Sequence, residues 1–161
     1  MQANLRDSNA IVQGLTRIHI YQGQGLKIEY MRFDSRSKEA FNTAQLGAVL
    51  ARSQEYLLPL RFDSNGADML AYNPATNATR AIQIKARVTV DARYSGKNLW
   101  IAFPHWVNYS QQDWYVVPHD TLVQFWGAKK VAAGRAFSAG TPSKQLLKTL
   151  AGYRVGSVAL G

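Results

Sequence analysis

The strongest constraint on this fold is a pair of short apolar segments joined by a turn. Residues 67–72 (ADMLAY) and 79–90 (TRAIQIKARVTV) are rich in apolar residues, and the second alternates apolar with polar residues as a strand does. Between them stands NPATN, in which Asn and Pro favour a turn and Asn77 tolerates a left-handed backbone. Two strands joined this closely are expected to pair antiparallel, as a hairpin.

Hairpin geometry predicts which polar side chains meet. Successive side chains of a strand point to opposite faces, so three polar residues share one face of the second strand: Gln83, Lys85 and Arg87. If Tyr72 lies across from Thr79, then Asp68 lies across from Gln83, with Cβ atoms about 4.5–5.5 Å apart. A carboxylate, an amide and an amine then converge on one patch. The structural alternative is a polar strand face with an ordinary Asp–Lys pair.

Composition and charge narrow the function. The chain has 161 residues, which fits one domain spanning 1–161, and no cysteine, which excludes disulfides and thiolate metal sites. Nineteen Lys and Arg against ten Asp and Glu give a net charge of +9, which favours nucleic acid as a partner. An anionic membrane surface is the main alternative partner. The third possibility is a basic protein whose charges are solvated and bind no polyanion. No secretory signal or transmembrane stretch is visible, so we expect a cytoplasmic protein without a membrane partner.

The remaining segments predict a layered α+β or mixed α/β domain. Residues 1–35 are expected to form an N-terminal arm or hairpin. A helix is expected over 35–53, with Ser37 as N-cap and an apolar stripe of Phe41, Ala44, Ala48 and Ala51 widened by Leu46, Val49 and Leu50. Strands are expected over 55–62, 98–104 and 113–118, with a break at DSNG between the first of these and residues 67–72. A short helix or strand is expected from HDTLVQFW, and a final helix from TPSKQLLKTLAGYR, with Thr141 as N-cap.

At this point the sequence resembles the PD-(D/E)xK nuclease superfamily. GADMLAYN followed by IQIKAR looks like its carboxylate strand and its (D/E/Q)xK strand, and the helix before them and strands after them match in order over roughly residues 38–126. The Holliday-junction-resolvase-like or homing-endonuclease-like branches are the most similar. The resemblance implies a restriction-endonuclease-like core, a central mixed sheet of about four to five strands flanked by helices.

The resemblance also implies roles for particular residues. Asp68 would bind the metal, Mg²⁺ or Mn²⁺, together with Gln83 and the backbone carbonyl of Ile84. Lys85 would assist the attacking water. Gln45 stands where many members have a helix Glu. The sequence departs from the family there, because amides replace carboxylates at positions 45 and 83. Asp63, Glu55 or Glu39 could add a second carboxylate.

Other residues carry weaker signals. Five basic residues are candidates for phosphate contacts: Arg87, Lys129, Lys130, Arg135 and Lys144. The three histidines, His19, His105 and His119, have no metal-ligand spacing and are expected to be structural or exposed. Most aromatic residues are expected in the core, although some near Lys or Arg could stack on bases.

Three functional hypotheses follow. The first is a metal-dependent DNA endonuclease of the QxK type that acts on DNA as a homodimer or higher homo-oligomer without a small-molecule cofactor. The second is a catalytically inactive nucleic-acid-binding module with the same fold, favoured by the missing helix Glu. The third is a partner-binding or structural domain whose charge is incidental, which predicts no salt-dependent DNA affinity.

Overall fold

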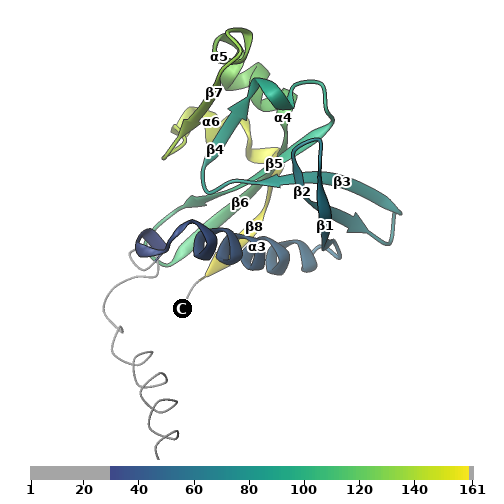
Figure 1. Cartoon of the computed structure of the whole chain (residues 1–161). Coiled ribbons are helices and arrows are strands. Elements are labelled where there is room, and N and C mark those ends of the chain that lie inside the picture. Colours follow the sequence, from purple (N-terminus) through teal and green to yellow (C-terminus); the bar gives the residue numbers. More distant parts are fainter. Residues whose placement is uncertain (1–29, 160–161) are drawn as a thin grey trace, which may run out of the picture.

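The computed structural model describes residues 30–159, apart from the side chains of residues 62–64, and shows an α+β fold (Figure 1). Its elements are, in chain order, α3 (Ser35–Ala51), β1 (Tyr56–Ser64), β2 (Ala67–Asn73), β3 (Ala78–Ile84), β4 (Val88–Asp91), η2 (Ala92–Tyr94), β5 (Leu99–Trp106), β6 (Gln111–Pro118), α4 (His119–Leu122), η3 (Val123–Gly127), α5 (Ala128–Ala132), β7 (Ala136–Ala139), α6 (Lys144–Thr149), η4 (Ala151–Tyr153) and β8 (Arg154–Ala159). The predicted class is confirmed. Residues 30–32 are helical, and the rest of the predicted arm lies outside the described residues.

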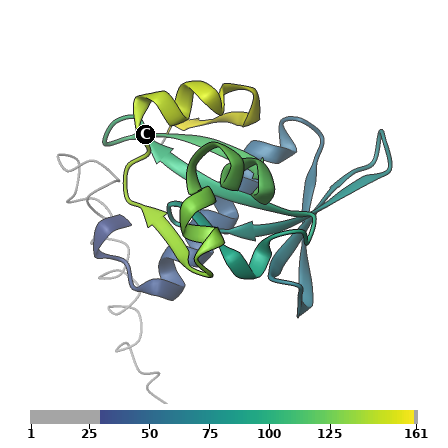
Figure 2. The same cartoon turned by 90° about the horizontal axis from the view of Figure 1, so that it is seen from above.

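A mixed six-stranded sheet forms the centre of the fold, in the order β1-β2-β3-β5-β6-β8, and is larger than the four to five strands expected. β3 and β5 are parallel, and every other neighbouring pair in the sheet is antiparallel. A second, two-stranded sheet pairs β4 with β7. From above, the hairpin of β2 and β3 projects away from the rest of the molecule (Figure 2).

The prediction of one continuous strand over 79–90 is wrong. β3 ends at Ile84, and residues 88–91 form β4 in the second sheet. The reason is topological, because β3 pairs parallel with β5, and two parallel strands need a crossover that leaves the sheet. Arg87 therefore does not continue the face that carries Gln83.

Left-handed residues close the two hairpins on either side of β2. Asn65 and Gly66, with φ of 58° and 92°, join β1 to β2, so the chain turns within the predicted DSNG break after β1 has run on to Ser64. This pair of positive φ angles is typical of a two-residue hairpin turn. Asn77 has φ of 53°, as predicted for the turn between β2 and β3.

Helix α3 is confirmed as an element, but its cap and buried face differ from those predicted. Asp34 is the N-cap, and its carboxylate accepts a hydrogen bond from the Ser37 backbone N at 2.7 Å. The helix buries four residues: Asn42, Leu46, Val49 and Leu50. Ala44, Ala48 and Ala51 face solvent instead. Burying the larger Leu and Val side chains removes more apolar area from water than burying alanines would.

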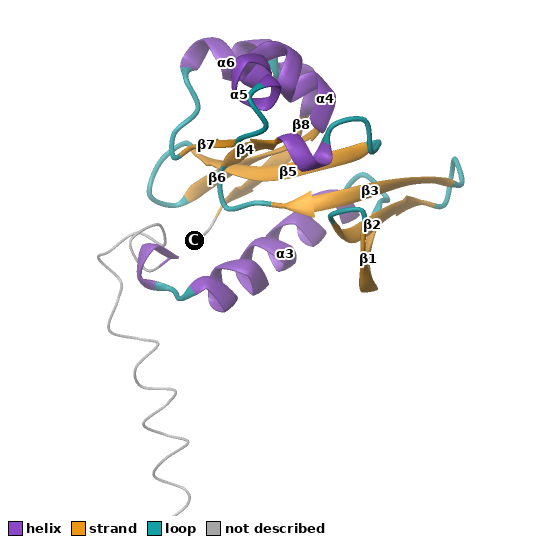
Figure 3. Ribbon diagram, turned by 45° about the horizontal axis from the view of Figure 1, so that its top comes forward, coloured by secondary structure: helices purple, strands orange, loops and turns teal. Residues whose placement is uncertain are grey.

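Two layers cover the central sheet, one on each face (Figure 3). α3 packs on one face, in a core that includes Leu46, Ile82 and Trp114. The other face carries Ile101, Phe103 and Tyr115 and is covered by the segments from α4 to α6 together with β4. Gln83 is paired with Ile101, so its side chain belongs to this second face, away from α3.

The C-terminal helix begins two residues later than predicted. Ser143, not Thr141, is the N-cap of α6, and its hydroxyl accepts from the Leu146 backbone N at 3.1 Å. Residues 119–126 are helical, which resolves the open choice between a helix and a strand. Among the described residues, no helix has the length and apolar character needed to span a membrane.

Candidate functional site

The predicted meeting of Asp68 and Gln83 is present in the structure. Tyr72 pairs with Thr79 and Met69 with Ile82, so Asp68 and Gln83 are the next pair in the predicted register. The Asp68 carboxylate accepts hydrogen bonds from the Gln83 side-chain amide and from the backbone N of Ile84, the latter at 3.1 Å. The side chain of Asp68 thus continues the contact between β2 and β3 beyond their last main-chain pair.

The Gln83 amide is held at both ends. Its Nε2 donates to Asp68, and its Oε1 accepts from the hydroxyl of Tyr94 at 3.3 Å. Gln83 is only 7% exposed, and its hydrogen bond to Tyr94 is buried, whereas its bond to the exposed Asp68 is partly open to water. Tyr94 itself is buried and packs edge-on against the ring of His119, at 5.7 Å between ring centroids. Sequence reasoning missed Tyr94 as a partner of the patch.

Lys85 follows the last residue of β3 and completes the patch. Its backbone N donates to the carbonyl of Ala102 at 2.8 Å, which keeps it aligned with β5. Its Nζ lies 5.7 Å from the centroid of the Tyr94 ring, within the range of a cation–π contact. Asp68, Gln83, Tyr94 and Lys85 therefore form one connected group, which we call the Asp68–Lys85 patch.

A second carboxylate, Asp91, borders this patch. Hydrogen bonds from the Arg93 side chain, opposed by partial burial, lower the pKa of Asp91, and the nearby Lys85 ammonium lowers it further. The Asp91 backbone N donates to Nε2 of His119 at 3.1 Å, which gives this buried histidine a structural role. Asp91 could not be identified from the sequence, because the sequence pattern predicts that β4 continues β3. The local signal for Asp91 is its position two residues before Arg93, whose backbone N donates to the Asp91 carboxylate.

The other candidate carboxylates and Gln45 lie elsewhere. Gln45 is on α3, on the opposite face of the sheet from Gln83, so the structure does not bring it to the patch. Glu55 forms an ion pair with Arg80, whose guanidinium lies over Trp100. Glu39 is exposed on α3, and the side chain of Asp63 is not described.

The predicted phosphate-binding residues are all exposed. Lys129 and Lys130 lie on α5, Arg135 follows that helix, and Lys144 begins α6. These elements cover the face of the sheet that carries Gln83. Most of the predicted basic residues and the Asp68–Lys85 patch therefore lie on the same side of the central sheet.

The described residues hold no group of three or more His, Cys, Asp or Glu side chains that could enclose a metal by themselves. A metal at this patch would have to complete its shell with water and a bound phosphate, as Mg²⁺ commonly does. No family model matches the chain, and the searches found no match among curated proteins or solved structures.

Proposed function

We propose that this protein is a metal-dependent DNA endonuclease that hydrolyses phosphodiester bonds at the Asp68–Lys85 patch. The observation that supports the proposal is the hydrogen bond between Asp68 and Gln83 where β2 and β3 stop pairing, with Lys85 beside Tyr94, the tyrosine that also binds Gln83. A carboxylate, an amide oxygen and an ammonium on two adjacent strands are the parts that the QxK form of a PD-(D/E)xK site requires. The restriction-endonuclease-like core belongs to the same proposal, with α3, β2, β3, β5 and β6 as its elements.

The residues present fit a metal that takes few ligands from protein. Asp68, the amide oxygen of Gln83 and the backbone carbonyl of Ile84 supply hard oxygen donors of the kind that Mg²⁺ and Mn²⁺ prefer. In the structure the Nε2 of Gln83 faces Asp68, so the amide must rotate by half a turn for its oxygen to bind a metal held by Asp68. Tyr94 permits this rotation, because a tyrosine hydroxyl can accept from the amide N–H₂ as well as donate to the oxygen.

When bound, the metal would polarise the phosphoryl oxygens and lower the pKa of a coordinated water. The protein's own residues have separate tasks. Lys85, fixed by the β5 backbone and the ring of Tyr94, places a positive charge where negative charge develops at phosphorus. The exposed lysines of α5 and α6, with Arg135 after α5, hold the DNA backbone and set its position without reading its sequence. Cleavage of both strands calls for two such sites, so the proposal includes a homodimer or higher homo-oligomer.

The test is cleavage of supercoiled plasmid and of branched DNA in Mg²⁺, Mn²⁺ or EDTA. We expect nicking or linearisation by the wild type in either metal, and a loss of at least about a hundredfold for Asp68→Asn and Lys85→Gln, the scale of removing one transition-state interaction. The matched control is Glu39→Gln, which removes an exposed carboxylate on α3, away from the patch, and should leave the rate unchanged.

A second candidate is a nucleic-acid-binding module that does not cleave. This candidate is favoured because both carboxylates already have partners and are less available to a metal. Asp68 accepts two N–H groups, and Asp91 is paired with Arg93. This candidate predicts DNA binding of equal strength in Mg²⁺ and in EDTA. Intact plasmid in both metals, together with such binding, would exclude the nuclease and leave the binding module.

A further inference from the structure

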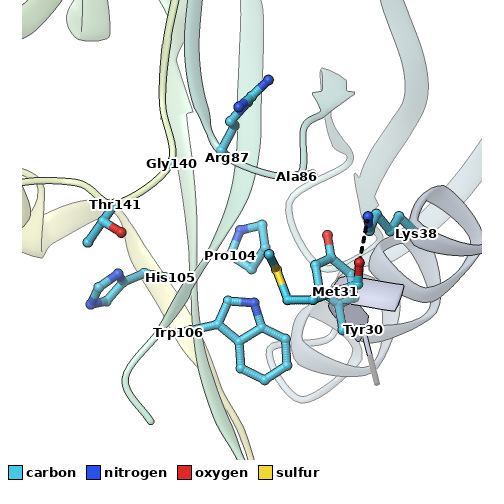
Figure 4. Close-up of a pocket in the computed structure, with 10 residues that line it drawn as sticks. All are labelled: Tyr30, Met31, Lys38, Ala86, Arg87, Pro104, His105, Trp106, Gly140 and Thr141. Atoms are coloured by element: carbon cyan, nitrogen blue, oxygen red, sulfur yellow. Dashed lines mark hydrogen bonds between the residues drawn. The ribbon is translucent and has the colours of Figure 1, made fainter. Parts of the chain in front are cut away.

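A pocket of about 540 Å³ opens where the two parallel strands end, beside the Asp68–Lys85 patch (Figure 4). Its walls come from residues 86 and 87 beyond β3, residues 104–106 at the end of β5, residues 30 and 31 before α3, Lys38 on α3, and residues 140 and 141 after β7. Figure 4 shows Met31 beside Pro104 and Trp106, with Lys38 next to Met31. A volume of this size is in the range of sites for small organic ligands.

The described lining is cationic. It includes Lys38 and Arg87, and none of its ten residues is Asp or Glu. Lys38 uses one N–H on the carbonyl of Met31, at 3.3 Å, and an ammonium has three such donors. Arg87 is exposed and extends from the rim of the pocket. Two positive side chains with donors to spare suit a phosphate group.

An aromatic wall faces these charges. The half-buried Trp106 contacts Tyr30 at 5.5 Å between ring centroids, and Tyr30 packs in turn on Phe41 at 5.4 Å. Tyr30 is 4% exposed and its hydroxyl accepts from the side-chain amide of Asn42 at 3.1 Å, so the support behind Trp106 is fixed. A rigidly held indole at the edge of a pocket is a stacking surface for a planar, aromatic group.

These two properties together select a ligand with an aromatic ring and a phosphate. We propose that the pocket binds one unpaired nucleotide of the DNA, its base against Trp106 and its phosphate between Lys38 and Arg87. Arg87 is two residues beyond Lys85, a chain distance of at most about 7 Å, so the bound nucleotide would continue directly into the strand at the patch. A base cannot enter the pocket while it is stacked in a duplex. The inference rests on the proposed function for its DNA ligand, and adds that the protein selects DNA with unpaired bases.

The experiment measures binding without metal, so it does not depend on cleavage. Fluorescence anisotropy in EDTA would compare a blunt duplex with the same duplex carrying a short single-stranded tail. We expect the wild type to bind the tailed DNA about tenfold more tightly, which lies within the range measured for stacking one base on an aromatic side chain. Trp106→Leu should remove most of that preference and leave duplex affinity nearly unchanged. Arg87→Gln should also remove most of the preference, and it should weaken duplex binding as well, because Arg87 is one of the predicted phosphate contacts. Tyr109→Leu, an exposed aromatic between β5 and β6 outside the pocket, is the matched control and should keep the preference.

Equal affinity for both DNAs, or a preference that survives both pocket substitutions, would overturn the inference. Titration with free dAMP separates the two sources of the ligand chemistry: quenching of tryptophan fluorescence by dAMP, without any preference for tailed DNA, would identify a free-nucleotide site and also overturn it. Plasmid cleavage without the tail preference would leave the nuclease standing and remove this inference alone. A preference for tailed DNA without plasmid cleavage would support the nucleotide pocket and exclude the nuclease.

Discussion

Asp91 is a residue whose charge is set by its neighbours on two elements. Hydrogen bonds from the Arg93 side chain lower the pKa of Asp91 below the ordinary value of about 3.9, although partial burial opposes this shift. The Lys85 ammonium lowers the pKa further. A carboxyl whose pKa is lower in the folded state stabilises the fold at pH values above its unfolded pKa. That contribution disappears as the pH falls through the folded pKa.

We therefore predict that Asp91→Asn lowers the free energy of unfolding by about 1 kcal/mol at pH 7, since Arg93 is mostly exposed and its pairing is screened. The difference from wild type should shrink as the pH falls below about 4, the unfolded pKa, and should be lost below the folded pKa. Urea denaturation at pH 7, 5 and 3 would measure it, with Glu39→Gln as a control expected to show no difference at pH 7. A difference of the same size at pH 3 would show that the carboxylate acts through packing and not through charge.

At the same scale, the sequence predicts part of the site well. Asp68, Gln83 and Lys85 belong to one hairpin, and strand alternation with turn chemistry is enough to bring them together. Tyr94 and Asp91 reach the patch through the crossover between two parallel strands. Such a contact depends on which strands pair, and no local pattern in a single sequence contains that information.

The β1–β2 hairpin turn is an element with an unexpected neighbour. A Cβ added to Gly66 would lie 2.5 Å from Cε1 of Tyr94, and the residue has φ of +92°. Gly66→Ala should therefore push on the tyrosine that holds Gln83, and we expect it to lower the free energy of unfolding by at least about 2 kcal/mol. Gly96→Ala is the matched control, because its φ is also positive and nothing lies within 4 Å of the added Cβ.

The control should cost only about 1 kcal/mol, the scale of placing a side chain in the left-handed region. Chemical denaturation of both variants gives the comparison. Equal losses for the two glycines would mean that the Tyr94 ring moves aside freely, and that the turn does not support the patch.

Other elements show where sequence patterns stop being informative. Strands β5 and β6 and helix α3 were predictable because their apolar content is dense and their ends carry turn or cap residues. The buried face of α3 was not predictable, because its alanines and its larger apolar residues form two competing apolar stripes. Contact with the sheet determines that Leu46, Val49 and Leu50 are the residues buried. β7 and β8 were missed, since AFSA and RVGSVA are short, Gly- or Ser-containing strands stabilised by their partners.

At the scale of the whole molecule, the described acidic side chains are mostly engaged. Glu55, Asp91 and Asp113 pair with arginines, and Asp34 caps a helix. The lysines of α5 are exposed and take no part in these ion pairs. We predict that Lys129→Ala combined with Lys130→Ala weakens duplex DNA binding and reduces the slope of log K against log salt by about 2, close to one for each phosphate that a lysine no longer neutralises.

Anisotropy titrations at several salt concentrations would measure this slope. Arg52→Gln, at the far end of α3, provides a control of the same charge type, and its slope should match the wild type. An unchanged slope in the double variant would place the DNA on another face.

The contact between α3 and β8 has a consequence for synthesis of the chain. The Arg52 guanidinium donates to the carbonyl of Ser157 at 2.8 Å, across a sequence separation of 105 residues, and Val49 lies against Gly156. During translation, the helix is complete long before the strand that covers it exists. Val49 therefore lacks its contact with Gly156 until β8 has been synthesised, and apolar surface left open in this way is accessible to chaperones and to other chains.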